Sequence, residues 1–112
     1  MEQNIILSKE EFKAFLLIYA AQTNFIETNE ELEFIELRFS KEIIQKIRKL
    51  ISTLNDYQKS ELIIKHIKHN DYSQKDLDSI LNEIKEMYDS DGKFDSLEQS
   101  IFYMLEKLLT VN

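Results

Sequence analysis

The chain contains no cysteine and no proline, and Gly92 is its single glycine. Without cysteine it can form neither disulfides nor thiolate metal sites, and it has no cysteine nucleophile. Because β-hairpins depend on turn residues such as glycine and proline, their scarcity argues against a β-sheet protein. One glycine is also too few for a glycine-rich phosphate-binding loop. What remains is a chain of helices joined by short polar connections.

Long apolar segments are absent as well. No run approaches the roughly 20 apolar residues that a membrane-spanning helix needs. The first seven residues, Met1 to Leu7, lack the basic start and extended apolar stretch of a secretory signal. We therefore expect a cytoplasmic protein with no membrane insertion, for which any membrane association is peripheral and made through a partner.

Positive charge is the minority: 14 Lys and Arg residues stand against 21 Asp and Glu residues, for a net charge of -7. Such a surface repels phosphate backbones, and the basic residues are dispersed along the chain, so we expect no nucleic-acid binding. Acidic surfaces suit cations or basic partner proteins. The length of 112 residues matches one domain with one core, which predicts a single domain over residues 1–112.

Apolar residues recur at helical spacing in six segments. Five of these segments follow a residue suited to cap a helix N-terminus: Ser8, Ser40, Asp56, Ser73 and either Asp95 or Ser96. The other segment, from Thr28 to Phe39, is acidic at its start, as the helix dipole favours. The first segment is apolar almost all round, which predicts a central helix. Short connections favour antiparallel neighbours. The sequence therefore predicts an all-α, compact single-domain bundle of about six helices.

Two parts of the chain follow one plan. Setting residues 16–37 beside residues 84–105 without a gap aligns the apolar positions of both segments and also the polar positions between them. The pairs are Tyr19 with Met87, Ile26 with Phe94, Glu27 with Asp95, Glu30 with Glu98, Phe34 with Phe102 and Leu37 with Leu105. The loop matches fall outside helical periodicity, so they favour a true repeat. We expect two pseudo-symmetric helix-loop-helix units.

The loop of the second unit is similar to the later part of a calcium-binding EF-hand loop, in which oxygen ligands alternate, a glycine makes the turn and a glutamate closes the site. The ligand positions are occupied by Asp89, Asp91, Asp95 and Glu98. The first ligand position is Met87, which offers no hard oxygen, so a tight standard EF-hand is not expected. A divalent cation such as calcium, magnesium or manganese is the cofactor that this loop could hold.

The first unit could complete that site. If the two loops lie close together in space, Glu27 and Glu30 would add carboxylates to a shared cation site. The alternative is plain helix punctuation, in which Gly92 ends one helix and Asp95 with Glu98 forms the capping box of the next. Both interpretations use the same residues.

Two helix-loop-helix units, each with an acidic turn closed by a glutamate and preceded by small or apolar residues such as Tyr19, Ala20 and Ala21, resemble the TerB-like family of tellurite-resistance-associated proteins. The resemblance covers residues 16–109, and its best-matched motif runs from Asp91 to Glu98. It implies a compact all-α protein that binds cations and acts as a stress-linked adaptor with protein partners, without enzymatic activity. The sequence departs from the family pattern at Thr23 and Asn24, where an Asp-Gly pair is expected.

Other candidate chemistry is weaker. His66 and His69 stand three apart, a spacing that can place two imidazoles on one metal, but an exposed helix end is the simpler interpretation. The carboxylate pairs Glu10 with Glu11, Glu30 with Glu31 and Asp76 with Asp78 lie at helix starts, where exposed carboxylates stabilise the helix dipole. We therefore predict no catalytic residues and no enzyme. The alternative to the cation-binding adaptor is a purely structural protein-protein interaction module without a metal site.

Overall fold

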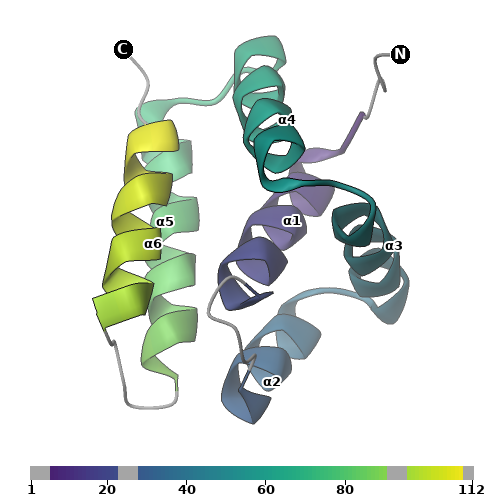
Figure 1. The fold of residues 1–112 in the computed structure, drawn as a ribbon, viewed down its shortest axis with the longest axis vertical. Helices are drawn as coiled ribbons and strands as arrows, with labels where there is room; N and C mark the ends of the chain where they lie inside the picture. The colour runs from purple at the N-terminus through teal and green to yellow at the C-terminus, as the bar shows by residue number, and fades with distance from the viewer. Residues whose placement is uncertain (1–5, 23–27, 91–95, 110–112) are drawn as a thin grey trace.

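The computed structural model describes residues 6–22, 28–90 and 96–109, with the backbone alone for residues 96–98 and 101. Within these ranges the chain forms helices and no β-strand (Figure 1). The helices are α1 (Lys9–Gln22), α2 (Asn29–Arg38), α3 (Lys41–Ser52), α4 (Asp56–His69), α5 (Gln74–Asp89) and α6 (Ser96–Leu108). The predicted all-α single-domain bundle of six helices is confirmed.

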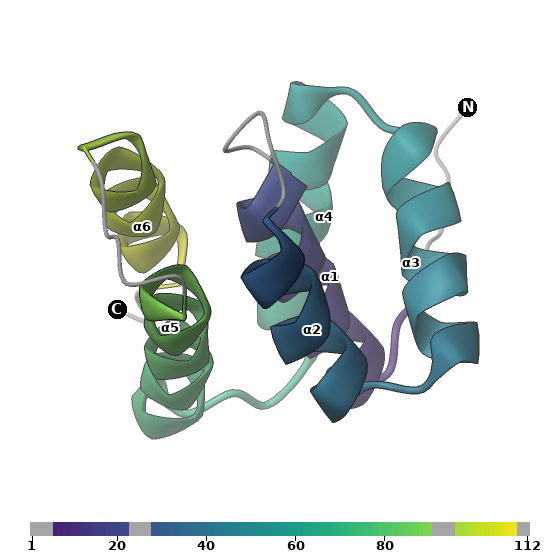
Figure 2. The same cartoon turned by 90° about the horizontal axis from the view of Figure 1, so that it is seen from below.

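Helix α1 lies at the centre of the bundle, between α3 on one side and the α5–α6 pair on the other (Figures 1 and 2). It packs against α2, α3 and α5, while α6 packs against α5. The principal extents of the molecule are 39 × 31 × 23 Å. Among the described helices, none combines the length and the apolar character that crossing a membrane requires.

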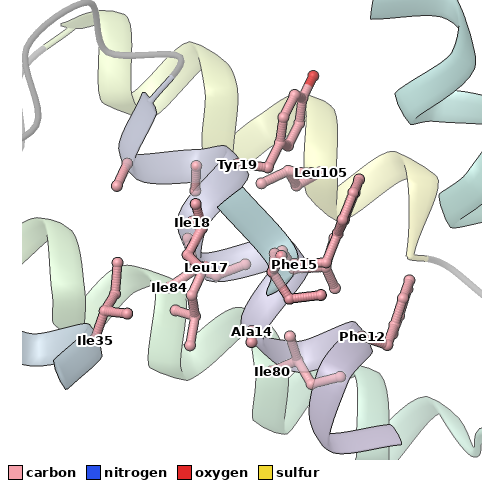
Figure 3. Packing of buried hydrophobic residues seen from close by; sticks show 14 of the residues in the cluster. Phe12, Ala14, Phe15, Leu17, Ile18, Tyr19, Ile35, Ile80, Ile84 and Leu105 are labelled. Carbon is pink, nitrogen blue, oxygen red and sulfur yellow. The ribbon is translucent and has the colours of Figure 1, made fainter. Parts of the chain in front are cut away.

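The central position of α1 follows from its composition. Its buried residues occupy every side of the helix: Phe12, Ala14, Phe15, Leu16, Leu17, Ile18, Tyr19, Ala20 and Ala21. A helix that is apolar all round is stable only where neighbours cover all of its faces. Figure 3 shows this arrangement, with Ile35 of α2, Ile84 of α5 and Leu105 of α6 gathered around the side chains of α1.

Local capping fixes where the helices begin. Ser8 caps α1 as predicted and forms a capping box with Glu11, in which the Glu11 N–H donates to Ser8 Oγ (3.1 Å) and the Ser8 N–H donates to Glu11 Oε1 (2.9 Å). Ser40 and Ser73 also cap as predicted, and Thr28 caps α2. The prediction that Asp56 caps α4 is wrong, because Asn55 accepts the Gln58 N–H at 2.8 Å and Asp56 is the first helical residue. Asn and Asp cap equally well, so adjacent candidates are hard to separate by sequence.

Two apolar side chains that lie within the helical patterns are exposed. Leu37 is 78% exposed, and Met104 also lies on the surface. In α2 the buried positions are Glu31 and Ile35. At 100° per residue, Leu37 lies on the far side of the helix from Ile35. The apolar residues of α2 therefore do not all share one face.

Candidate metal site at two helix-loop-helix turns

The two helices that lead into the acidic turns are joined at their C-terminal ends. The buried Tyr88 hydroxyl, one residue before the end of α5, donates a hydrogen bond to the main-chain oxygen of Ala20 at 2.8 Å. Ala20 lies two residues before the end of α1. The points from which the two turns leave their helices are thus held next to each other.

The same hydrogen bond joins equivalent positions of the repeat. Ala20 and Tyr88 are 68 residues apart, which is the offset that aligns residue 16 with residue 84. The hydrogen bond therefore joins two positions that the repeat alignment pairs.

Met87 stands at the first ligand position of the EF-hand-like pattern, and its side chain is fully buried in the core. Its equivalent Tyr19 is buried as well. The main-chain oxygen of Met87 accepts the Ser90 N–H at 3.2 Å and the Ser90 hydroxyl at 2.6 Å. Position 87 thus contributes packing and helix termination, and α5 ends at Asp89, before the predicted stop at Gly92, which lies outside the described residues.

The predicted ligands are described to different extents. Asp89 is the last residue of α5 and Glu30 is the second residue of α2, and both are exposed. Glu98 lies in the first turn of α6 with its backbone alone described, whereas Glu27, Asp91 and Asp95 lie outside the described residues. In the part of the chain that the structure describes, no three His, Asp or Glu side chains gather as a metal site would require. The six-residue site therefore stays a prediction.

Glu31, next to the predicted ligand Glu30, is fully buried. Its Oε1 accepts hydrogen bonds from the Thr28 N–H at 3.0 Å and from the Thr28 hydroxyl at 3.1 Å. The prediction that both carboxylates are exposed is therefore wrong for Glu31, because the inner face of α2 carries this residue against the core. The signal was present in the Thr-x-x-Glu spacing, which is that of a capping box.

Charged side chains connect the two units further along the same helices. Lys13 of α1 lies 2.7 Å from Glu83 of α5, and Arg38 of α2 lies 3.6 Å from both Glu83 and Glu86. The Arg38 guanidinium also stacks over the Phe34 ring at 3.4 Å. These contacts link α1, α2 and α5, so the rotation of each unit against the other is fixed at more than one point.

The histidine pair is not a metal site in this fold. His66 is buried on the inner face of α4 beside Leu62 and Ile63, whereas His69 is exposed. The prediction that both lie on one exposed face is therefore wrong for His66. The sequence pattern of α4 did not predict this burial, because a polar imidazole occupies a position where an apolar residue would mark the buried face of the helix.

These features define a class of protein: a small all-α bundle in which two helix-loop-helix units meet through the C-terminal ends of their first helices. No family model matches this chain, and no curated protein or solved structure matches it either.

Proposed function

We propose that this chain is a non-enzymatic, TerB-like helical protein that binds a divalent cation through its two acidic turns and engages a protein partner as a stress-linked adaptor. The proposed ligands are Asp89, Asp91, Asp95 and Glu98 from the second unit, with Glu27 and Glu30 from the first. Calcium, magnesium and manganese all prefer such oxygen donors.

The observation that carries the proposal is the hydrogen bond between Tyr88 and Ala20. It supports a shared site because it holds together the two helix ends that lead into the acidic turns. Calcium takes six to eight oxygen ligands, and one short turn by itself offers too few. The exposure of Asp89 and Glu30 is also in keeping with ligands that meet an ion from solution.

The test is thermal unfolding of the metal-stripped protein with and without millimolar calcium, magnesium or manganese. A ligand that binds only the native state stabilises it by about 1.4 kcal/mol at ten times its Kd. We expect a saturable rise in Tm that is lost in the double variant Asp91→Asn, Glu98→Gln. That variant keeps side chains able to cap a helix while removing two negative charges.

A matched control removes the same charge elsewhere. Glu36→Gln with Glu42→Gln neutralises two exposed carboxylates on α2 and α3, neither of which is a proposed ligand. The control should keep the metal-dependent rise in Tm. An equal loss in both variants would mean a diffuse charge effect, and the absence of any rise with all three ions would overturn the proposal.

The second candidate is a purely structural interaction module in which the turns only cap helices. It is favoured by Leu37 and by Tyr57, which is 73% exposed, since large apolar and aromatic side chains on a surface suit partner contacts. It predicts no response to metal. Because Asn and Gln still cap a helix, the double variant would then leave both the stability and the response to metal nearly unchanged.

A further inference from the structure

The side chain of His66 in α4 is packed against α1. It is part of the inner face of α4 and is 8% exposed. The imidazole stacks on the ring of Phe12 in α1, with centroids 4.0 Å apart and planes inclined by 20°. The Tyr72 ring lies 5.5 Å away and is tilted by 50°. A titratable group therefore sits where α4, the connection to α5 and the start of α1 meet.

Hydrogen bonds around His66 define which ring nitrogen carries the proton. The side-chain amide nitrogen of Asn70, the C-cap residue of α4, donates to the main-chain oxygen of His66 at 2.8 Å. Since a carbonyl oxygen can only accept, this bond fixes the orientation of the Asn70 amide. The same nitrogen lies 3.4 Å from His66 Nδ1, which must accept. The proton is therefore on Nε2, which donates to the Tyr72 hydroxyl at 3.0 Å.

Protonation would break this arrangement. A second proton on Nδ1 would point at the Asn70 amide nitrogen, which is a donor with no capacity to accept. The new charge would also be buried close to Lys9, whose Nζ lies 4.9 Å from the centre of the Tyr72 ring. Burial first, and then the charge of Lys9, hold the pKa of His66 below its ordinary value.

Other charged groups reach this region from each neighbouring element. Lys65 and His69 are exposed on α4, and the connection to α5 contributes Asp71. The Asp76 carboxylate at the start of α5 would favour an imidazolium, but it accepts the Ser73 N–H at 3.1 Å. Neither ring nitrogen of His66 is hydrogen-bonded to a carboxylate, because Nε2 faces the Tyr72 hydroxyl and Nδ1 faces the Asn70 amide.

The Phe12 ring favours the protonated form of His66, because an aromatic face attracts a cation. This attraction is smaller than the loss of a satisfied buried hydrogen-bonding group together with the desolvation of the charge. The contact between Nδ1 and the Asn70 amide therefore outweighs this attraction. The neutral imidazole is the form that fits the packing of α4 against α1.

We propose that His66 is a pH-sensitive latch, in which protonation of its imidazole releases the C-terminal end of α4 and the Asn70–Ser73 connection from the start of α1. A histidine whose pKa is lower in the folded state stabilises the fold fully above its unfolded pKa of about 6.5. That stability is lost as the pH falls below this value, by up to about tenfold in the folding constant per pH unit.

The direct test uses the fact that the chain has only two histidines. An NMR titration of the imidazole resonances should show a pKa for His66 below the value of about 6.5 that an unperturbed histidine has. Hydrogen exchange, corrected for intrinsic rates, should speed up at pH 5 first in residues 62–73 and leave α5 protected. A pKa of His66 at or above about 6.5, or a uniform loss of protection, would overturn the proposal.

Three variants separate the latch from general acid destabilisation. His66→Phe keeps an aromatic ring against Phe12 and should flatten the fall in Tm between pH 7 and pH 5. The matched control His69→Gln removes the exposed imidazole and should leave that fall unchanged. If His66→Phe keeps the full fall, other groups cause it and the proposal fails.

Asn70→Asp provides the third variant and remains informative if His66→Phe does not fold. It puts a carboxylate oxygen where the amide nitrogen faces Nδ1, so an imidazolium gains an acceptor. The pKa of His66 measured by NMR should then rise above that of the parent chain. An unchanged or lower pKa would show that the Asn70 contact does not hold the imidazole neutral.

Discussion

The two helix-loop-helix units share a sequence plan but differ in how deeply they are buried. Leu16 and its equivalent Ile84 are both fully buried, as are Ala20 and Tyr88. In contrast, Leu17 and Ile18 are fully buried, whereas the residues at the equivalent positions of α5 are the exposed Lys85 and Glu86. One unit supplies the central helix of the bundle and the other covers one side of it, so the repeat defines the contact between units but not the surroundings of each.

The second helices of the two units differ more. Ile35 of α2 is fully buried, and its equivalent Tyr103 of α6 is 59% exposed. Leu37 and Leu105 show the reverse, with Leu105 fully buried. Helix α2 packs among α1, α3 and α5, whereas α6 packs chiefly against α5. The neighbouring helices, rather than the turn residues, therefore determine which face of each second helix is buried.

The largest expected effect comes from replacing a leucine with alanine at each of two equivalent positions, Leu105 of α6 and Leu37 of α2. Leu105→Ala should lower the free energy of unfolding by about 2–5 kcal/mol, because it removes buried methyl groups and leaves a cavity. Leu37→Ala should change it by less than about 0.5 kcal/mol, since the side chain is already in water. Urea unfolding followed by circular dichroism measures both. Similar losses in the two variants would contradict the different rotation of α2 and α6.

An intermediate effect is expected where the units meet. Tyr88→Phe removes the hydroxyl that donates to Ala20 and keeps the ring, so the free energy of unfolding should fall by about 0.5–1.5 kcal/mol. Tyr103→Phe makes the same chemical change at an exposed position and should leave stability unchanged within error. Both are measured by urea unfolding. If Tyr88→Phe is neutral as well, the hydrogen bond between the units contributes nothing measurable to their association.

Local features of the fold could be predicted from the sequence. Ser8, Ser40 and Ser73 each precede an apolar pattern at helical spacing, and each caps a helix in the structure. Capping depends on side chains a few residues apart, so a single sequence contains the needed information. The continuous apolar character of α1 likewise predicted its central place.

Features that depend on distant neighbours could not be predicted in this way. Leu37 is apolar and lies within an amphipathic segment, yet its exposure depends on where α1, α3 and α5 pack against α2. His66 is polar, and its burial follows from Phe12 lying opposite it, 54 positions earlier in the chain. For the candidate metal site, the repeat offset paired Ala20 with Tyr88, but no periodic pattern shows that a tyrosine hydroxyl joins them. Whether the acidic turns bind a cation also stays a prediction.

The smallest expected effect lies at the first turn of α1. Glu11 of α1 is 2.6 Å from Lys46 of α3, whereas the same offset of 68 residues places the exposed Ser79 in the second turn of α5. Lys46→Gln should cost about 0.2–1 kcal/mol at pH 7, as expected for an ion pair at the surface. The cost should shrink in high salt because the charges are screened. The control Lys49→Gln changes an exposed lysine of the same helix and should be neutral.

The pH dependence of this variant checks its cause. The hydrogen bond from Lys46 first, and then the one from the Ser8 N–H, lower the pKa of Glu11 below its ordinary value. A carboxyl group with a lowered folded pKa stabilises the fold above its unfolded pKa of about 4.3, and this contribution is lost as the pH falls through the folded pKa. The unfolding free energies of Lys46→Gln and the parent chain should therefore differ at pH 7 and converge toward pH 3. A difference that persists at pH 3 would show that Lys46 acts through the packing of its alkyl chain rather than through its charge.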